Sequence, residues 1–279
     1  MTAQLLIYET VVPLSASRHR GSGLEMSRNY GFSAKTNSVP LMAVEFPHAA
    51  SEYAIVFAGT KESVMPAVIL GVRESENLFL SQEANWDAKY IPAFVRRYPF
   101  VFSMSQDGQR FVLCVDEAYS GFNREGRGQK LFGDDDKPTT YVDNILKFLQ
   151  GYQAQFNRTL AFCQKLRELD LLEPMQAQLE MASGEKLSLA GFMAVSRAKL
   201  KALPGEKLAE LAKTDELELI YLHLQSMRNF QALPARLAVV KGGAGSPSRE
   251  AGQDPGAEPA EGATGEDRGT KSRASRASA

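Results

Sequence analysis

Hydrophobic residues in the first 135 positions form short runs that polar and turn-forming residues separate. Four runs, at 39–46, 53–58, 67–72 and 111–115, are rich in β-branched and aromatic residues. Short runs bounded by such punctuation predict strands joined by turns. Apolar and polar residues alternate incompletely within them, so several strands are expected to be buried on both faces.

After Tyr141 the apolar positions recur every three or four residues. They fall at 145, 148, 149, 152, 156, 160, 163 and 166. This spacing predicts one stripe of a long amphipathic helix. Thr139 or Thr140 is expected to cap its start and Pro174 to end it, while Gly151 predicts a weak point inside it, a kink or a close contact.

The remaining ordered part is predicted to mix a hairpin with short helices. Residues 175–195 alternate apolar and polar positions on both sides of a Ser-Gly pair, which is typical of a β-hairpin. Ser196 is expected to cap one helix, and a second helix starts behind Pro204. Residues 216–237 begin with a strand-like alternation and continue as a helical stripe. The predicted class is α+β, with a strand-rich N-terminal half packed against a helical C-terminal half.

A change of composition near residue 240 predicts a domain boundary. In residues 241–279 alanine is the only apolar type besides Gly and Pro. Such a segment buries too little surface to offset the entropy lost on ordering, so a disordered tail is predicted. Residues 1–240 then form one domain, or two closely packed lobes at about 1–135 and 136–240.

Composition narrows the classes of partner. The chain has 279 residues, of which 44% are hydrophobic and 23% charged, with a formal charge of −1. A nucleic-acid partner is not predicted, because such proteins usually carry a basic excess. The two cysteines are far apart in the sequence, which favours buried thiols in a reducing compartment over the alternative of one structural disulfide.

The N-terminal residues predict a cytoplasmic location. No Lys or Arg precedes Arg18, and Glu9 interrupts the apolar stretch, which is unlike a secretory signal. No run approaches the roughly 20 apolar residues that span a bilayer, so no transmembrane segment is expected. Surface association then requires a dedicated exporter.

The densest group of aromatic and basic residues runs from 86 to 102, WDAKYIPAFVRRYPFVF, and includes the only Trp. Either these side chains fill a core or they line a ligand site, because both are rich in aromatics. The candidate ligand-binding residues are Trp86, Tyr90, Arg96, Arg97, Tyr98 and Asn77. If the segment is extended, Arg96 and Arg97 point to opposite faces, and one of them is expected to pair with Glu76 or Asp116.

No catalytic motif is recognisable, and enzymatic activity stays open. The sequence has no Gly-x-Ser-x-Gly elbow, Walker loop or dinucleotide fingerprint, so no cofactor is predicted. His19, Glu45 and His223 are a weak alternative metal site, because no HExxH or comparable spacing links them.

Several blocks resemble the SapC family of bacterial proteins. They are AVILGVRESENLFL, NWDAKYIPAFVRRYPFVF, LCVDEAYSGF, GQKLFGDDDKPTTYV and ELELIYLHLQSMRNFQAL, and the similarity extends over most of residues 1–237. The resemblance implies association with the bacterial surface layer and brings no catalytic residues with it.

Two hypotheses follow from the resemblance and the residues together. The first is a non-enzymatic role in binding a protein or a glycan. The second is a cytosolic enzyme or accessory subunit that binds a small ligand or metal in a cleft near Trp86 and Arg96. The oligomeric state is left open.

Overall fold

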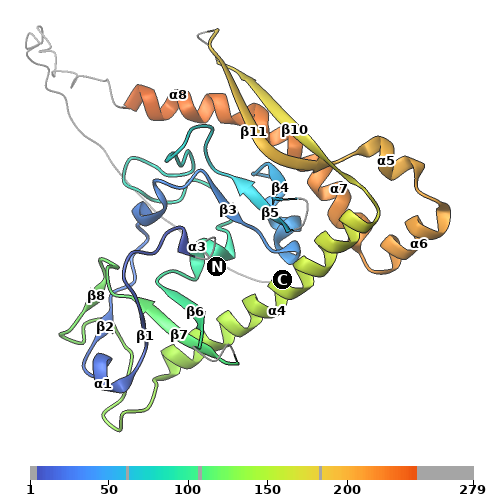
Figure 1. Cartoon of the computed structure of the whole chain (residues 1–279). Helices are drawn as coiled ribbons and strands as arrows, with labels where there is room; N and C mark the ends of the chain where they lie inside the picture. Colours follow the sequence, from blue (N-terminus) through green and yellow to red (C-terminus); the bar gives the residue numbers. More distant parts are fainter. Residues whose placement is uncertain (1–4, 61–62, 106–108, 182–183, 244–279) are drawn as a thin grey trace, which may run out of the picture. The chain divides into compact units, whose positions relative to one another are not determined.

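The computed structural model describes residues 5–60, 63–105, 109–181 and 184–243, and within them it confirms the α+β class. Sheets dominate the N-terminal half and helices the C-terminal half (Figure 1). The strands are β1 Val11–Pro13, β2 Gly23–Leu24, β3 Ser38–Pro40, β4 Ile55–Gly59, β5 Val64–Ile69, β6 Phe100–Met104, β7 Phe111–Asp116, β8 Phe122–Asn123, β9 Gln129–Lys130, β10 Leu172–Glu180 and β11 Lys186–Val195. The helices are α1 Ala16–His19, η2 Gly31–Ser33, η3 Ala43–Glu45, α2 Phe46–Ala49, α3 Ala93–Arg96, α4 Thr140–Glu168, α5 Arg197–Ala202, α6 Gly205–Lys213, α7 Glu216–Ser226, η4 Met227–Ala232 and α8 Leu233–Gly243.

The largest sheet of the described chain has five antiparallel strands in the order β10-β11-β4-β5-β3. Strands β4 and β5 pair from Ile55 opposite Val68 to Gly59 opposite Val64. Gly59 ends this ladder with φ of +122°, and a Cβ there would lie 2.1 Å from the Ser63 carbonyl oxygen. The turn between β4 and β5 therefore requires glycine.

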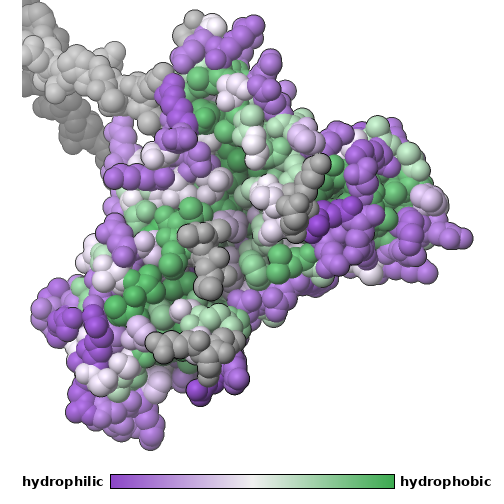
Figure 2. All heavy atoms as spheres, in the orientation of Figure 1, coloured by the Kyte–Doolittle hydropathy of each residue, from purple (hydrophilic) through white to green (hydrophobic). Residues whose placement is uncertain are grey.

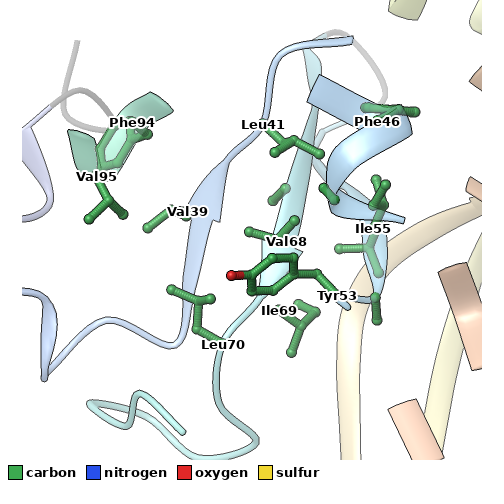
Figure 3. Close-up of a cluster of buried hydrophobic side chains, with 14 of the residues drawn as sticks. Val39, Leu41, Phe46, Tyr53, Ile55, Val68, Ile69, Leu70, Phe94 and Val95 are labelled. Carbon is green, nitrogen blue, oxygen red and sulfur yellow. The ribbon is translucent and has the colours of Figure 1, made fainter. Parts of the chain in front are cut away.

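The apolar core surrounds this sheet. Tyr53, Ile55 and Val68 meet Val39 and Leu41 in its interior (Figure 3), and none of the five is more than 1% exposed. Large buried side chains of this kind supply most of the favourable free energy of folding.

Side chains on one face of α7 form hydrogen bonds with backbone groups of β4 and β11. Strands β4 and β11 pair only at Phe57 and Met193 in the described chain. Beside that pair, His223 donates from Nδ1 to the Ile55 carbonyl at 2.8 Å and accepts the Val195 N–H at Nε2 at 3.0 Å. One turn further, the Ser226 hydroxyl accepts the Ile55 N–H at 3.0 Å. Side chains from a helix thus satisfy backbone groups that a longer ladder would pair.

Helix α4 is the long helix that the three-to-four spacing predicts, and it spans 29 residues. Thr139 occupies the N-cap position, but its hydroxyl donates to the Lys130 carbonyl at 2.7 Å rather than capping the helix. The buried Thr159 accepts the Ala43 N–H at 2.9 Å, which fixes α4 against η3.

The predicted end of α4 was wrong, and of the two alternatives given for Gly151, a kink or a close contact, the close contact was wrong. The helix ends at Glu168, before Pro174, because Pro174 lies in the edge strand β10, where a missing N–H is tolerated. At Gly151 an added Cβ would meet nothing within 4 Å, so this glycine makes no close contact.

The predicted strand positions held for 53–58 and 111–115, which contain most of β4 and β7, and in part for 67–72, which contains the second half of β5. The run at 39–46 is not one strand, since β3 gives way to η3 after Leu41. The strand predicted at the start of residues 216–237 is also wrong. Helix α7 covers it, and Ile220, His223 and Ser226 are buried at helical spacing.

The described residues lie in one compact unit that ends by Gly245. Helix α8 reaches Gly243, and the predicted disordered tail from there to residue 279 lies outside the described residues. Within the described chain, no helix combines the length and apolar character needed to cross a lipid bilayer.

Candidate functional site

The block of aromatic and arginine residues folds as a loop, a helical turn and then strand β6. Helix α3 begins after Pro92 and ends at Arg96, so the two arginines lie on a helical turn and not on an extended strand as expected. They nevertheless diverge. Arg96 is exposed, whereas Arg97 is only 4% exposed.

Arg97 belongs to the interior. Its guanidinium carbon lies 4.3 Å from the ring centre of Phe94, 5.0 Å from Tyr152 and 5.7 Å from Tyr8. Aromatic faces stabilise a desolvated cation through their quadrupoles. Burial raises the pKa of Tyr152 to about 12, which keeps this phenol neutral beside the cation. Of the two acidic residues expected to pair with an arginine of this block, Glu76 contacts Arg73, and Asp116 accepts the N–H groups of Glu9 and Thr10.

Tyr98 also belongs to the interior. Its ring stacks on Phe32 with centroids 4.0 Å apart and meets Tyr119 edge-on at 5.5 Å. Burial, with a smaller effect of Asp116, raises the pKa of its hydroxyl. This side chain packs a core.

Trp86 and Asn77 make hydrogen bonds that hold loops. The indole Nε1 of Trp86 donates to the Tyr53 hydroxyl at 2.8 Å. The Asn77 amide donates to Ser33 Oγ and the Ser33 carbonyl at 3.2 Å, and its oxygen accepts the Phe79 N–H at 2.9 Å. Three of the four hydrogen bonds that the side-chain amide of Asn77 can form are therefore made within the fold.

Tyr90 and Arg96 form a surface together with two residues that the sequence did not suggest. The guanidinium carbon of Arg96 lies 5.8 Å from the Tyr90 ring centre and 5.6 Å from that of Phe148. The His48 ring stacks on Tyr90, 5.3 Å away and tilted by 21°. We call His48, Tyr90, Arg96 and Phe148 the Arg96 platform. Phe148 comes from α4 and His48 from α2, so only the fold brings them to the loop before α3.

A buried carboxylate fixes the platform from below. Glu45 is 3% exposed and accepts the Tyr90 hydroxyl and the Ala93 N–H at one oxygen, both at 2.7 Å. Its other oxygen accepts the Met42 N–H at 2.8 Å. Burial raises the pKa of Tyr90, and the Glu45 charge adds to this effect. The Tyr90 phenol therefore stays a proton donor, and its ring is held in one position.

Glu52 fixes the backbone beside the platform. Its carboxylate accepts the N–H groups of Lys89 and Tyr90, both at 2.9 Å. The Tyr90 carbonyl in turn accepts the Tyr53 hydroxyl, which joins this loop to the core.

The three residues of the alternative metal site each contact a different partner. His19 faces Glu117 at 3.3 Å, Glu45 binds Tyr90, and both nitrogens of His223 contact backbone groups. Among the residues that the structure describes, no group of three or more His, Cys, Asp or Glu side chains is placed to hold a metal ion. Both cysteines are free and buried, as expected, and burial raises the pKa of Cys163 to about 12.

A groove of about 1010 Å³ lies between the end of α4 and the β10–β11 hairpin. Its floor includes Phe192 and Met193, but its polar rim is already engaged. Gln164 donates to Glu168 at 2.8 Å, and Asp170 pairs with Lys199 at 2.8 Å. Polar groups that satisfy one another are not left for a ligand. Trp86 and Arg96 do not line this groove.

A family model described as SapC matches residues 14–233. No curated protein and no solved structure matches the chain. The matched span contains the whole Arg96 platform, from His48 to Phe148.

Proposed function

The chain belongs to the SapC family, and we propose that it is a non-enzymatic binding protein whose Arg96 platform contacts a protein partner at the bacterial surface layer. The association with the surface layer is the part that the family resemblance implies. Export by a dedicated machine belongs to the same proposal.

The exposed, rigidly held guanidinium of Arg96 is the observation that supports the binding role. Two rings flank it, and the Glu45 and Glu52 carboxylates hold Tyr90 in place. Arg and Tyr dominate the hot spots of protein interfaces, because they bring large contact areas at little cost in conformational entropy. Side chains that are fixed before binding lose little freedom when the partner arrives.

An exposed apolar residue is next in the chain to the carboxylate that holds Tyr90. Val44 lies in η3, directly before Glu45, and is 52% exposed. An apolar contact beside a charged one is typical of an interface, where area gives affinity and charge gives specificity.

Site-specific photo-crosslinking in the producing cell tests the proposal. A photoreactive residue replaces Val44, and a control carries it at Tyr221 on α7, which is 47% exposed. We expect a discrete crosslinked product from position 44 that weakens in the Arg96→Ala background and is absent from position 221. Equal products from both positions, or a product that Arg96→Ala leaves unchanged, would show that the platform is not the binding surface.

Fractionation of the same cells tests the location. Crosslinked protein in the surface wash supports association with the surface layer. Crosslinked protein confined to the cytosol contradicts the surface part of the proposal and leaves the binding role in place.

A further inference from the structure

We propose that the Arg96 platform recognises a carboxylate side chain on an acidic segment of the protein partner. This inference rests on the proposed function and adds the chemistry of the group that is bound.

Several arginines of the described chain already hold a carboxylate. The salt bridges are Arg18 and Arg124 to Glu117, Arg20 to Asp136, Arg73 to Glu76, Arg127 to Glu25 and Arg236 to Asp87. Four of these pairs, from Arg18, Arg20, Arg124 and Arg127, lie in the part of the molecule formed by α1, β2 and β8, where Figure 2 shows hydrophilic residues gathered. Their guanidinium groups are therefore neutralised within the fold.

Arg96 differs from them. No carboxylate of the described residues lies within 4.0 Å of its guanidinium, although the side chain is held in place. Its Nε donates to the Ile91 carbonyl at 2.9 Å, and the rings of Tyr90 and Phe148 flank its carbon. An arginine that is both ordered and without an acidic partner is prepared to receive one from another molecule.

The nearby acidic groups do not compete for it. The oxygens of Glu45 accept hydrogen bonds from Tyr90, Ala93 and Met42. Those of Glu52 accept backbone N–H groups. Because the oxygens of both carboxylates are already hydrogen-bonded to other groups, neither carboxylate pairs with Arg96. The positive charge of Arg96 is therefore available for an external anion.

The geometry of a guanidinium selects the ligand class. Its terminal amino groups form a planar fork that matches a carboxylate or a phosphate with two parallel hydrogen bonds, and of these two groups the carboxylate is the one that a protein carries in its own side chains. The flanking rings lower the exposure of the cation to water and strengthen such a bond. Charge complementarity therefore points to Asp or Glu side chains.

A protein fits this surface better than an acidic glycan. Sugars bind proteins by stacking on open aromatic faces, and the Tyr90 ring is already engaged by His48 and Arg96. The exposed Val44 offers an apolar contact that suits a peptide side chain.

Binding of defined probes to the full chain tests the inference. The probe is a capped peptide of alternating Leu and Glu, and its control has Gln in place of each Glu. A third probe is an oligogalacturonate, which carries carboxylates on a sugar. NMR of the arginine Nε–H groups follows binding. We expect the Arg96 signal to shift with the Glu peptide and to remain in place with the Gln peptide and with the oligogalacturonate.

Three variants assign the effect. Arg96→Gln is expected to weaken binding of the Glu peptide about tenfold or more, the loss of roughly one charged hydrogen-bonded pair. Arg96→Lys keeps the charge without the fork and is expected to lose less. Arg197→Gln is the matched control, because Arg197 is also exposed and lies on α5, and it is expected to bind as the original chain does. Circular dichroism confirms that each variant is folded.

Each failure has a distinct meaning. Equal binding of the Glu and Gln peptides, or full binding by Arg96→Gln, overturns the carboxylate inference even where the crosslink from position 44 persists. Binding of oligogalacturonate alone overturns the protein partner in favour of an acidic glycan. Specific binding of the Glu peptide without any crosslink in cells keeps the recognition chemistry and overturns the proposed function.

Discussion

His223 shows how one buried side chain replaces a strand pair. It is fully buried, and it bridges the Ile55 carbonyl of β4 and the Val195 N–H of β11. This arrangement requires a neutral ring with the proton on Nδ1, because Nε2 must accept a hydrogen bond. Burial accordingly lowers the pKa of His223 to about 4.

A pH-dependent stability follows from that shift. Between pH 6.5 and about 4 the unfolded chain binds a proton at His223 that the folded chain does not. The contribution of this group is full above pH 6.5, falls as the pH drops, and is lost below about 4. Its size is about 3 kcal/mol.

Urea unfolding at pH 7.5, 6 and 4.5 measures this effect. We expect His223→Ala to lower the free energy of unfolding at pH 7.5 and to flatten its slope between pH 6 and 4.5. The exposed His48→Ala is the control for the removal of a histidine side chain. Parallel pH curves for the original chain and His223→Ala would contradict the assignment.

The side chain of Trp86 also contributes to stability. It is half-buried, donates to the Tyr53 hydroxyl and meets the Tyr30 ring at 5.7 Å. We expect Trp86→Phe to cost about 1 kcal/mol, the value of one hydrogen bond, and Trp86→Ala about 2 to 3 kcal/mol, because packing is lost as well. Chemical denaturation gives both values. If Trp86→Ala folds but loses the crosslink at position 44, Trp86 is part of the binding surface. If the folded variant keeps the crosslink, the role of Trp86 is structural.

At the scale of elements, α4 contains a removable weakness. Gly151 is exposed in the helix interior, and a Cβ there meets nothing within 4 Å. Because glycine costs a helix about 1 kcal/mol relative to alanine, we expect Gly151→Ala to stabilise the fold by about that amount.

Thermal and urea unfolding check the prediction against a second glycine. At Gly23 a Cβ would lie 2.3 Å from the Arg127 carbonyl oxygen, so Gly23→Ala should destabilise. The same sign for both variants would mean that the space around these two positions has been misjudged.

Helix α7 shows why the alternation of apolar and polar residues over a short segment can predict the wrong secondary structure. Its start, ELELIYL, alternates as a strand does, yet the segment is helical. The reason is tertiary. Ile220, His223 and Ser226 share one helical face, and two of them satisfy backbone groups of β4 and β11.

At the scale of the whole molecule, the last residues are expected to add nothing to stability. The compact unit ends at Gly245, and the following sequence has no apolar side chain larger than alanine apart from proline. We predict that deleting residues 246–279 leaves the melting temperature unchanged within error, with a deletion into α8 from Leu233 as the destabilising control. Leu233 and Leu237 are buried, so that control removes core side chains. A large loss from the shorter deletion would refute the boundary.

The sequence by itself determined the class of fold, the long helix, the hairpin, the family and the segment that carries the platform. Periodicity and turn residues are local properties, and a family signature is read residue by residue, so these features need no knowledge of distant contacts. Only the tertiary structure decided which of the two arginines is buried, since it sends Arg96 to the surface and Arg97 among buried rings. It alone brought His48 and Phe148 to Tyr90, because contacts between residues far apart in the chain depend on how sheets and helices pack.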